Sequence, residues 1–181
     1  MDPPLGDGVL RLYRTSHDLV ATFAPLPAGL DEQRERGLRL RSFDVAAPSL
    51  LEGVKATSYA SAFAARRDAE RAGADDALFV SAGVVLECAT ANIWWRRGDD
   101  LFTPATRPGV LPGVTRGFVC SAEHVIQGAF PLDDLLASDE AFTTSSVREV
   151  APVVDVDGLR IGDGRPGPAA ARLQAAIRSA A

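Results

Sequence analysis

The sequence predicts a mixed fold of the α+β or α/β class, with many short strands and three or four helices. Short apolar runs separated by turn residues occupy much of residues 77–103, which is typical of strands. Helical spacing of apolar residues occurs over residues 57–73 and again after residue 113. Of the 181 residues, 46% are hydrophobic, so the chain can bury a core and is not intrinsically disordered.

The first fifty residues are not expected to form a domain of their own. Residues 9–14 and 19–23 alternate in polarity, which predicts two strands that could pair with each other. Residues 38–41 alternate again, after Pro25 and Pro27 have interrupted the pattern. These segments are predicted to be edge strands whose partners are absent.

The rest of the chain predicts strands and helices in alternation. The predicted strands are residues 77–80, 84–87, 91–95, 101–103 and 150–156. The predicted helices are residues 57–73, a helix from 113 to about 127, a short helix at 131–136 and a final alanine-rich helix that follows a loop at 162–168. Trp94 and Trp95 are adjacent in a strand, so they should point to opposite faces and serve in packing.

Charge and cysteine content exclude several classes of protein. The net charge of −5 argues against nucleic acid or an anionic membrane as the main partner. We expect a cytoplasmic protein, because no apolar run is long enough to span a membrane and residues 1–4 do not resemble a signal peptide. Cys88 and Cys120 have neither metal-ligand nor disulfide-framework spacing, so no metal site is expected.

Lys55 is the single lysine among 19 lysine and arginine residues. A lysine can lose its proton and attack a carbonyl to form a Schiff base, whereas a guanidinium stays charged. Chance retention of one lysine under strong coding bias is an equally good explanation of this residue alone. The lysine lies in GVKATSYA (residues 53–60), immediately before a predicted helix.

Three further segments follow Lys55 in order. In LECATANIW (residues 86–94), the carboxylate of Glu87 ends an apolar strand. In GVLPGVTR (residues 109–116), a turn rich in glycine and proline begins a helix, whose first N–H groups could bind a phosphate. The fourth segment is DEAFTTSS (residues 139–146), which ends in a turn of hydroxyl side chains.

Together these segments resemble the fold-type IV (class IV aminotransferase) family of pyridoxal 5'-phosphate (PLP) enzymes. The resemblance covers about residues 51–172 and is closest to the aminodeoxychorismate lyases. It implies the C-terminal pseudo-barrel domain of that fold and a pyridoxal 5'-phosphate cofactor.

The resemblance also implies a role for each candidate site residue. Lys55 would hold the cofactor as a Schiff base and act as the catalytic base. Glu87 would face the pyridine nitrogen. The phosphate would lie among the remaining four residues, namely Val114, Thr115, Ser145 and Ser146.

The resemblance divides the chain at residue 50. Residues 1–50 would be a remnant of the family's N-terminal α/β domain with the interdomain linker, and residues 51–181 would be the PLP-binding C-terminal domain. Thr15-Ser16-His17-Asp18 stands where the family usually has Thr-Arg-Gly, so the phosphate-binding arginine of that domain is not found here. The chain is therefore expected to be N-terminally truncated. The alternatives are a fragment of a longer protein, a sequence with a misplaced start site, or a shortened relative of the family.

The implied reaction is elimination of pyruvate from 4-amino-4-deoxychorismate, which gives 4-aminobenzoate for folate synthesis. One alternative is a branched-chain or D-amino-acid aminotransferase of the same family, because the cofactor machinery is common to both reactions. Another alternative is a truncated, non-catalytic fragment. The expected partners are a small amino substrate and a second copy of the chain in a homodimer.

Overall fold

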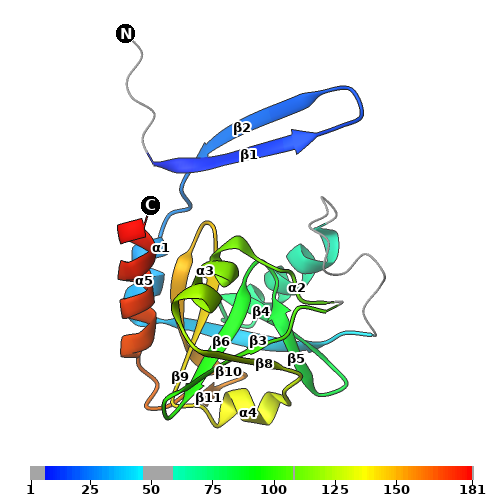
Figure 1. The fold of residues 1–181 in the computed structure, drawn as a ribbon. Helices are drawn as coiled ribbons and strands as arrows, with labels where there is room; N and C mark the ends of the chain where they lie inside the picture. Colours follow the sequence, from blue (N-terminus) through cyan, green and yellow to red (C-terminus); the bar gives the residue numbers. More distant parts are fainter. Residues whose placement is uncertain (1–6, 47–58, 108, 181) are drawn as a thin grey trace. The chain divides into compact units, whose positions relative to one another are not determined.

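The computed structural model describes residues 7–46, 59–107 and 109–180 (Figure 1). The chain forms two compact units, Met1–Leu30 and Asp31–Ala181. The described elements, in chain order, are β1 (Gly8–Arg14), β2 (Leu19–Pro25), α1 (Leu30–Arg36), β3 (Leu38–Asp44), α2 (Ala60–Arg71), β4 (Asp76–Ser81), β5 (Val84–Cys88), β6 (Asn92–Arg97), β7 (Asp100–Pro104), α3 (Val114–Ala122), β8 (Val125–Gly128), α4 (Leu132–Leu136), β9 (Glu140–Ser145), β10 (Glu149–Val156), β11 (Leu159–Arg160) and α5 (Pro168–Ala180).

The first unit is a hairpin of β1 and β2. The two strands pair antiparallel from Gly8 opposite Pro25 to Arg14 opposite Leu19, which confirms the pairing that their alternation suggested. At the turn, the Asp18 backbone N–H donates a 2.8 Å hydrogen bond to Thr15 Oγ1. A side chain that bonds the backbone in this way fixes the turn without a glycine.

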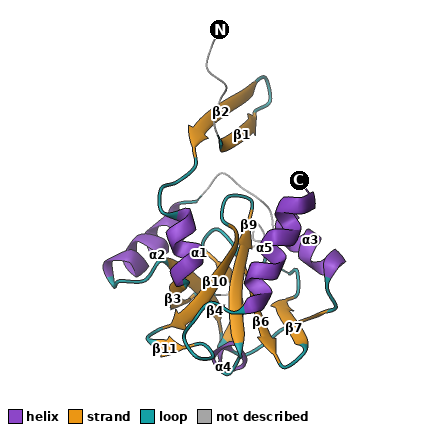
Figure 2. Ribbon diagram, turned by 90° about the vertical axis from the view of Figure 1, so that its left-hand side faces the viewer, coloured by secondary structure: helices purple, strands orange, loops and turns teal. Residues whose placement is uncertain are grey.

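The second unit is built on one mixed sheet. Among the described residues this sheet has nine strands, in the order β5-β4-β3-β10-β9-β6-β7-β8, with β11 paired to β10. The pairs β3–β4, β3–β10 and β7–β8 are parallel, and the other pairs are antiparallel. Helices α3 and α5 lie against the strands β9 and β10 (Figure 2).

The sheet curls until its two ends meet. The Val85 N–H of β5 donates to the Phe130 carbonyl at 2.9 Å, and the Leu132 N–H donates to the Gly83 carbonyl at 3.0 Å. Strands β5 and β8 are at the two ends of the strand order, and Phe130 and Leu132 follow β8 in the chain. These bonds therefore join β5 to the segment that immediately follows β8. The predicted pseudo-barrel of mixed α and β structure is thus confirmed.

The curled sheet separates two large hydrophobic cores, and a third, smaller cluster includes Ala69 of α2 and Ala77 of β4. The inner core includes Trp95 with Leu38 and Leu40, and the outer core includes Trp94 beneath α3 and α5. The two tryptophans do point to opposite faces of β6, as the alternation of a strand requires. Both are buried, since the helices cover the face that would otherwise meet solvent.

The prediction that residues 38–41 form an edge strand without partners is wrong. Strand β3 lies inside the sheet, parallel to β4 on one side and to β10 on the other. Leu38 and Leu40 are fully buried, so their alternation reflects one face packed in the core. This pairing also places residues 31–46 in the large unit, although the domain roles assigned to residues 1–50 and 51–181 stay predictions.

The predicted helix from residue 113 to about 127 is too long. Helix α3 ends at Ala122, and Glu123 takes an extended conformation with φ −131° and ψ 153°. The chain then forms β8, which pairs in parallel with β7. Val125 and Ile126 are β-branched residues that favour a strand, and the open edge of β7 gives that strand a partner. Helix α1 was not predicted at all.

No helix in the described part of the chain combines the length and the apolar character that crossing a membrane requires.

The inner core yields a stability prediction. Leu40→Ala should lower the free energy of unfolding by roughly 2–5 kcal/mol, because it removes a fully buried side chain and leaves a cavity. Leu159→Ala in β11 is the matched control, since Leu159 is 56% exposed, and should change that free energy by no more than about 0.5 kcal/mol. Denaturant unfolding measures both, and equal effects would contradict the core assignment.

Candidate active site

Glu87 lies near the end of β5 and is half-buried. Its Oε2 atom accepts a 2.8 Å hydrogen bond from the Leu111 backbone N–H and a 3.1 Å bond from Asn92 Nδ2. Two donors on one oxygen fix the orientation of this carboxylate. The predicted carboxylate is therefore connected to the turn before α3, although 24 positions separate Glu87 from Leu111.

Asn92 connects three of the predicted segments. It is the first residue of β6 and is buried. Its Nδ2 atom donates to Glu87 Oε2 and also to the Leu111 carbonyl, at 2.9 Å. Its backbone pairs with Thr144 of β9, which precedes Ser145. The single amide group thus joins the end of β5 to the turn before α3, while the strand that carries it adjoins β9.

Helix α3 begins with N–H groups that are not capped by a side chain. Gly113 is the N-cap residue, in an extended conformation, and no side-chain cap bond is found there among the described residues. Val114 is 86% exposed and Thr115 is half-buried. The first N–H groups of a helix lack intrahelical partners and carry partial positive charge, so this end can bind an anion.

Gly113 permits a close approach that another residue would block. A Cβ atom added at Gly113 would lie 2.4 Å from Asn92 Oδ1. Real Cβ atoms do not come this close to an oxygen, so the Asn92 carboxamide would have to move away from its bonds to Glu87 and Leu111. Gly113 therefore favours the observed position of Asn92, independently of any ligand.

Arg116 anchors the first turn of α3. Its side chain is buried, and Nη2 donates to the Pro104 carbonyl at 3.1 Å and to Gln127 Oε1 at 2.7 Å. The guanidinium carbon lies 5.8 Å from the ring centroid of Trp94, within the range of a cation–π contact. These contacts fix the beginning of the helix to the ends of β7 and β8.

Ser145 and Ser146 lie at the turn that joins β9 to β10. Ser145 ends β9 and is half-buried, and Ser146 is exposed in the turn. Ser145 Oγ accepts a 3.1 Å hydrogen bond from the Arg148 backbone N–H. A hydroxyl that accepts one bond keeps its own O–H to donate, so Ser145 can still bind an acceptor such as a phosphate oxygen.

The structure brings most of the predicted site residues to one region. Glu87 contacts the turn that precedes Val114 and Thr115, and Asn92 of β6 lies in register with the residue before Ser145. Lys55 lies outside the described residues, as does all of 47–58, and its predicted role stays a prediction.

Cys88 is the small buried residue that follows Glu87 on β5. Burial raises the pKa of the Cys88 thiol well above its usual range, and the neighbouring Asp76 raises it further. The protonated thiol is a weak nucleophile, so Cys88 serves in packing.

The described residues fit a phosphorylated aromatic cofactor. The N-terminus of α3 offers uncapped N–H groups, and Ser145 offers an O–H donor, which together suit a phosphate. Glu87 offers a fixed carboxylate, which suits a protonated ring nitrogen.

The chain is similar in sequence to known proteins. The family described as "Amino-transferase class IV" matches residues 4–156. A D-alanine aminotransferase of Bacillus licheniformis is 32% identical over 119 residues, which is 63% of this chain and 42% of that protein. An aminodeoxychorismate lyase of Bacillus subtilis is 35% identical over 97 residues, which is 51% of this chain and 33% of that protein.

The fold of this chain is similar to the folds of solved class IV aminotransferases. The branched-chain amino acid aminotransferase of Escherichia coli superposes with a TM-score of 0.81 at 27% identity, over 89% of this chain and 57% of that one. The T.th. branched-chain amino acid aminotransferase with pyridoxamine 5'-phosphate gives a TM-score of 0.74 at 26% identity, over 90% of this chain and 56% of that one.

The chain belongs to the class IV aminotransferase family. This family is one of PLP-dependent enzymes, as the resemblance of the motifs implied. The chain spans 42% and 33% of the two relatives named above and somewhat more than half of the two solved structures.

Sequence reasoning did not identify Asn92 as the residue that connects the site. The available signal is that Asn92 is a polar residue at the start of the apolar run 91–95, five positions after a carboxylate. A buried amide must find hydrogen-bond partners, so its position predicts a polar contact but not which one.

The contact between Gly113 and Asn92 yields a prediction. Gly113→Ala should lower the free energy of unfolding by about 1–3 kcal/mol, because the new Cβ displaces the Asn92 carboxamide. Gly117→Ala is the matched control on the same helix, where a Cβ meets nothing within 4 Å. It should raise the free energy of unfolding by roughly 0.5–1 kcal/mol. Equal shifts in thermal or denaturant unfolding would mean that Gly113 is not needed for the close approach.

Proposed function

We propose that this chain is the cofactor-binding part of a PLP-dependent enzyme and that its reaction is the elimination of pyruvate from 4-amino-4-deoxychorismate. The observation that carries the proposal is the connection through Asn92 of a fixed carboxylate to an uncapped helix N-terminus. A carboxylate for the ring nitrogen and a seat for the phosphate are the two fixed points that such a cofactor needs.

Four residues of this chain would bind the phosphate of the cofactor. Val114 and Thr115 would donate backbone N–H groups to the phosphate, and the Thr115 hydroxyl could add a donor. Ser145 and Ser146 would complete the phosphate site from the β9–β10 turn. The pyridoxal group supplies an electron sink when it is bound.

Two residues would act on protons. Glu87 would hold a proton on the pyridine nitrogen, because a carboxylate beside that nitrogen favours the cationic ring. Lys55 would hold the cofactor covalently and then, as a free amine beside the substrate, move a proton at the substrate carbon.

The identity of the substrate rests on similarity to one kind of relative. The segments around Glu87 and over residues 92–96 resemble those of aminodeoxychorismate lyases, and the lyase of Bacillus subtilis is 35% identical over 97 residues. Transamination of an amino acid is the second candidate, which the D-alanine aminotransferase of Bacillus licheniformis supports at 32% identity. A homodimer in the cytoplasm is proposed on the same family resemblance.

Product analysis distinguishes the candidates. The chain with added PLP is given 4-amino-4-deoxychorismate, and 4-aminobenzoate and pyruvate are measured. In parallel it is given D-alanine or a branched-chain amino acid with a 2-oxo acid, and the new amino acid is measured. Formation of 4-aminobenzoate supports the lyase, and transfer of the amino group alone supports the aminotransferase. The absence of both products would favour the non-catalytic fragment.

Glu87→Gln tests the role of the carboxylate. Glutamine keeps one oxygen to accept the bonds from Leu111 and Asn92, so the fold and cofactor binding should be retained. Turnover should fall by roughly 10²-fold, because the ring nitrogen loses its anionic partner. Glu70→Gln on the exposed face of α2 is the control and should leave turnover unchanged. Unchanged turnover in the Glu87 variant would make that residue structural.

A further inference from the structure

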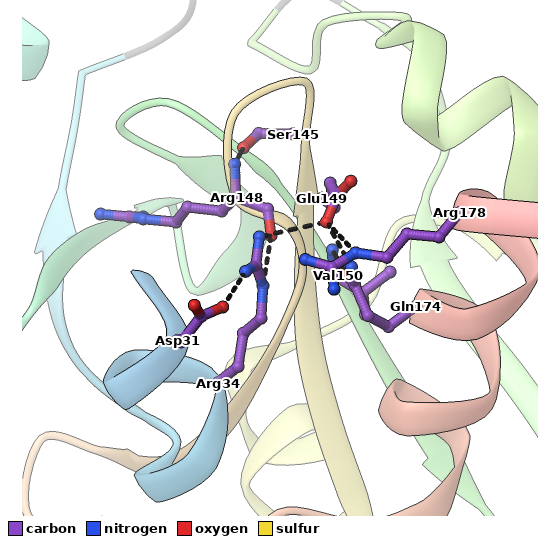
Figure 3. Close-up of polar contacts among 8 residues, drawn as sticks. All are labelled: Asp31, Arg34, Ser145, Arg148, Glu149, Val150, Gln174 and Arg178. Atoms are coloured by element: carbon purple, nitrogen blue, oxygen red, sulfur yellow. Dashed lines mark hydrogen bonds and ion pairs between the residues drawn. The ribbon is translucent and has the colours of Figure 1, made fainter. Parts of the chain in front are cut away.

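The turn between β9 and β10 is held in place by β4, α1 and α5, and Figure 3 shows its contacts with α1 and α5. Arg148, in this turn, forms a buried ion pair with Asp76 at the start of β4. The side chains of Arg148 and Asp76 are 7% and 0% exposed. Removing one partner of such a pair leaves an uncompensated buried charge, which is strongly destabilising. The ion pair therefore fixes the side of the turn that faces β4.

Arg34 of α1 holds the backbone of the same turn. Its Nη2 and Nε atoms donate to the Arg148 carbonyl at 3.0 and 3.3 Å, and Nη2 also donates to Glu149 Oε2 at 3.1 Å. The third guanidinium nitrogen, Nη1, bonds Asp31 at 2.7 Å. The rigid fork of an arginine can contact a carbonyl and a carboxylate together, which fixes the angle between them. Arg34 thereby connects α1 to the last residues of the turn (Figure 3).

Glu149 receives further donors from α5. Gln174 Nε2 donates to Glu149 Oε2, and Arg178 Nε donates to the same oxygen at 3.1 Å. Gln174 Oε1 accepts the Val150 N–H at 2.9 Å, which continues the connection along β10. The backbone of Glu149 has φ +56°, a left-handed conformation that is unfavourable for a non-glycine residue. The donors around its carboxylate stabilise this backbone conformation.

The conformation of the turn determines what Ser145 can do. The Arg148 N–H donates to Ser145 Oγ, which fixes the position of that oxygen relative to the turn. The O–H of Ser145 is then the group with which this side chain can donate to a ligand. Arg34 bonds the carbonyl of the same residue, in the next peptide group, so Ser145 and Arg34 restrain the Arg148 backbone from the two sides of its Cα atom.

We propose that Arg34 and Glu149 are positioning residues which set the affinity of the site for the phosphate of its cofactor. They do so by holding the β9–β10 turn so that Ser145 and Ser146 face that phosphate. This inference rests on the proposed function and adds residues that lie on α1 and at the start of β10, outside the predicted motifs. Neither residue contacts the cofactor, and both act through the turn.

The experiment compares two ligands that differ only in the phosphate. Spectral titration measures the dissociation constants of PLP and of pyridoxal for the unaltered chain and for Arg34→Ala. The variant should weaken PLP binding by about tenfold, which corresponds to one charge-assisted hydrogen bond of roughly 1.4 kcal/mol. Binding of pyridoxal should change by less than about twofold, because it lacks the group that the turn holds.

Two further variants control for general effects on the fold. Arg36→Ala removes a neighbouring arginine of α1 that bonds Asp75 and not the turn, so it should change neither dissociation constant. Arg178→Ala removes one donor to Glu149 from the other side and should weaken PLP binding in the same selective manner as Arg34→Ala, but less.

The outcomes separate the two proposals. If the unaltered chain binds neither ligand, the proposed function itself fails. If it binds PLP, and Arg34→Ala weakens PLP and pyridoxal equally or weakens neither, the positioning role of Arg34 is overturned while the proposed function stands. Selective loss of PLP affinity in Arg34→Ala and Arg178→Ala, with none in Arg36→Ala, is the result that supports the inference.

Discussion

The carboxamide of Asn92 is the contact on which the geometry of the candidate site depends. It donates to Glu87 at 3.1 Å and to the Leu111 carbonyl at 2.9 Å, while the Leu111 N–H donates to the same carboxylate at 2.8 Å. These three bonds form a small closed network in a half-buried region, where each bond is stronger than it would be in water. The network sets the distance between a carboxylate and the N-terminus of α3, which are the two groups that a charged, phosphorylated cofactor would contact at its opposite ends.

The surrounding fold keeps this network in place. Gly113 leaves room for the carboxamide, and Arg116 fastens the first turn of α3 to β7 and β8. Strand β9, which pairs with β6, continues directly into the β9–β10 turn, which Arg34, Asp76 and α5 hold. The curled sheet matters because it places β5, β6, β9 and the turn before α3 next to one another. The branched-chain amino acid aminotransferase of Escherichia coli has a similar backbone, with a TM-score of 0.81.

Local patterns in the sequence predicted most strands and helices, because alternation and helical spacing are properties of neighbouring residues. They could not place β3, since the alternation of Leu38 and Leu40 reveals a buried face but not the two parallel partners. Nor could they end α3 at Ala122, because β8 depends on pairing with β7. The motif residues Glu87, Ser145 and Ser146 were predicted from their resemblance to a family. Asn92, Arg34 and Glu149 were not predicted, since their contacts join elements far apart in the chain.

Covalent capture of the cofactor by the chain is the most direct test of this account. The purified chain is incubated with PLP and reduced with borohydride, and its peptides are analysed by mass spectrometry, with Lys55→Ala as the control. We expect a reduced cofactor adduct on the peptide that contains Lys55 and none in the variant. A folded chain that forms no adduct, or an adduct at the N-terminal amine alone, would contradict the assignment of a cofactor site to this chain.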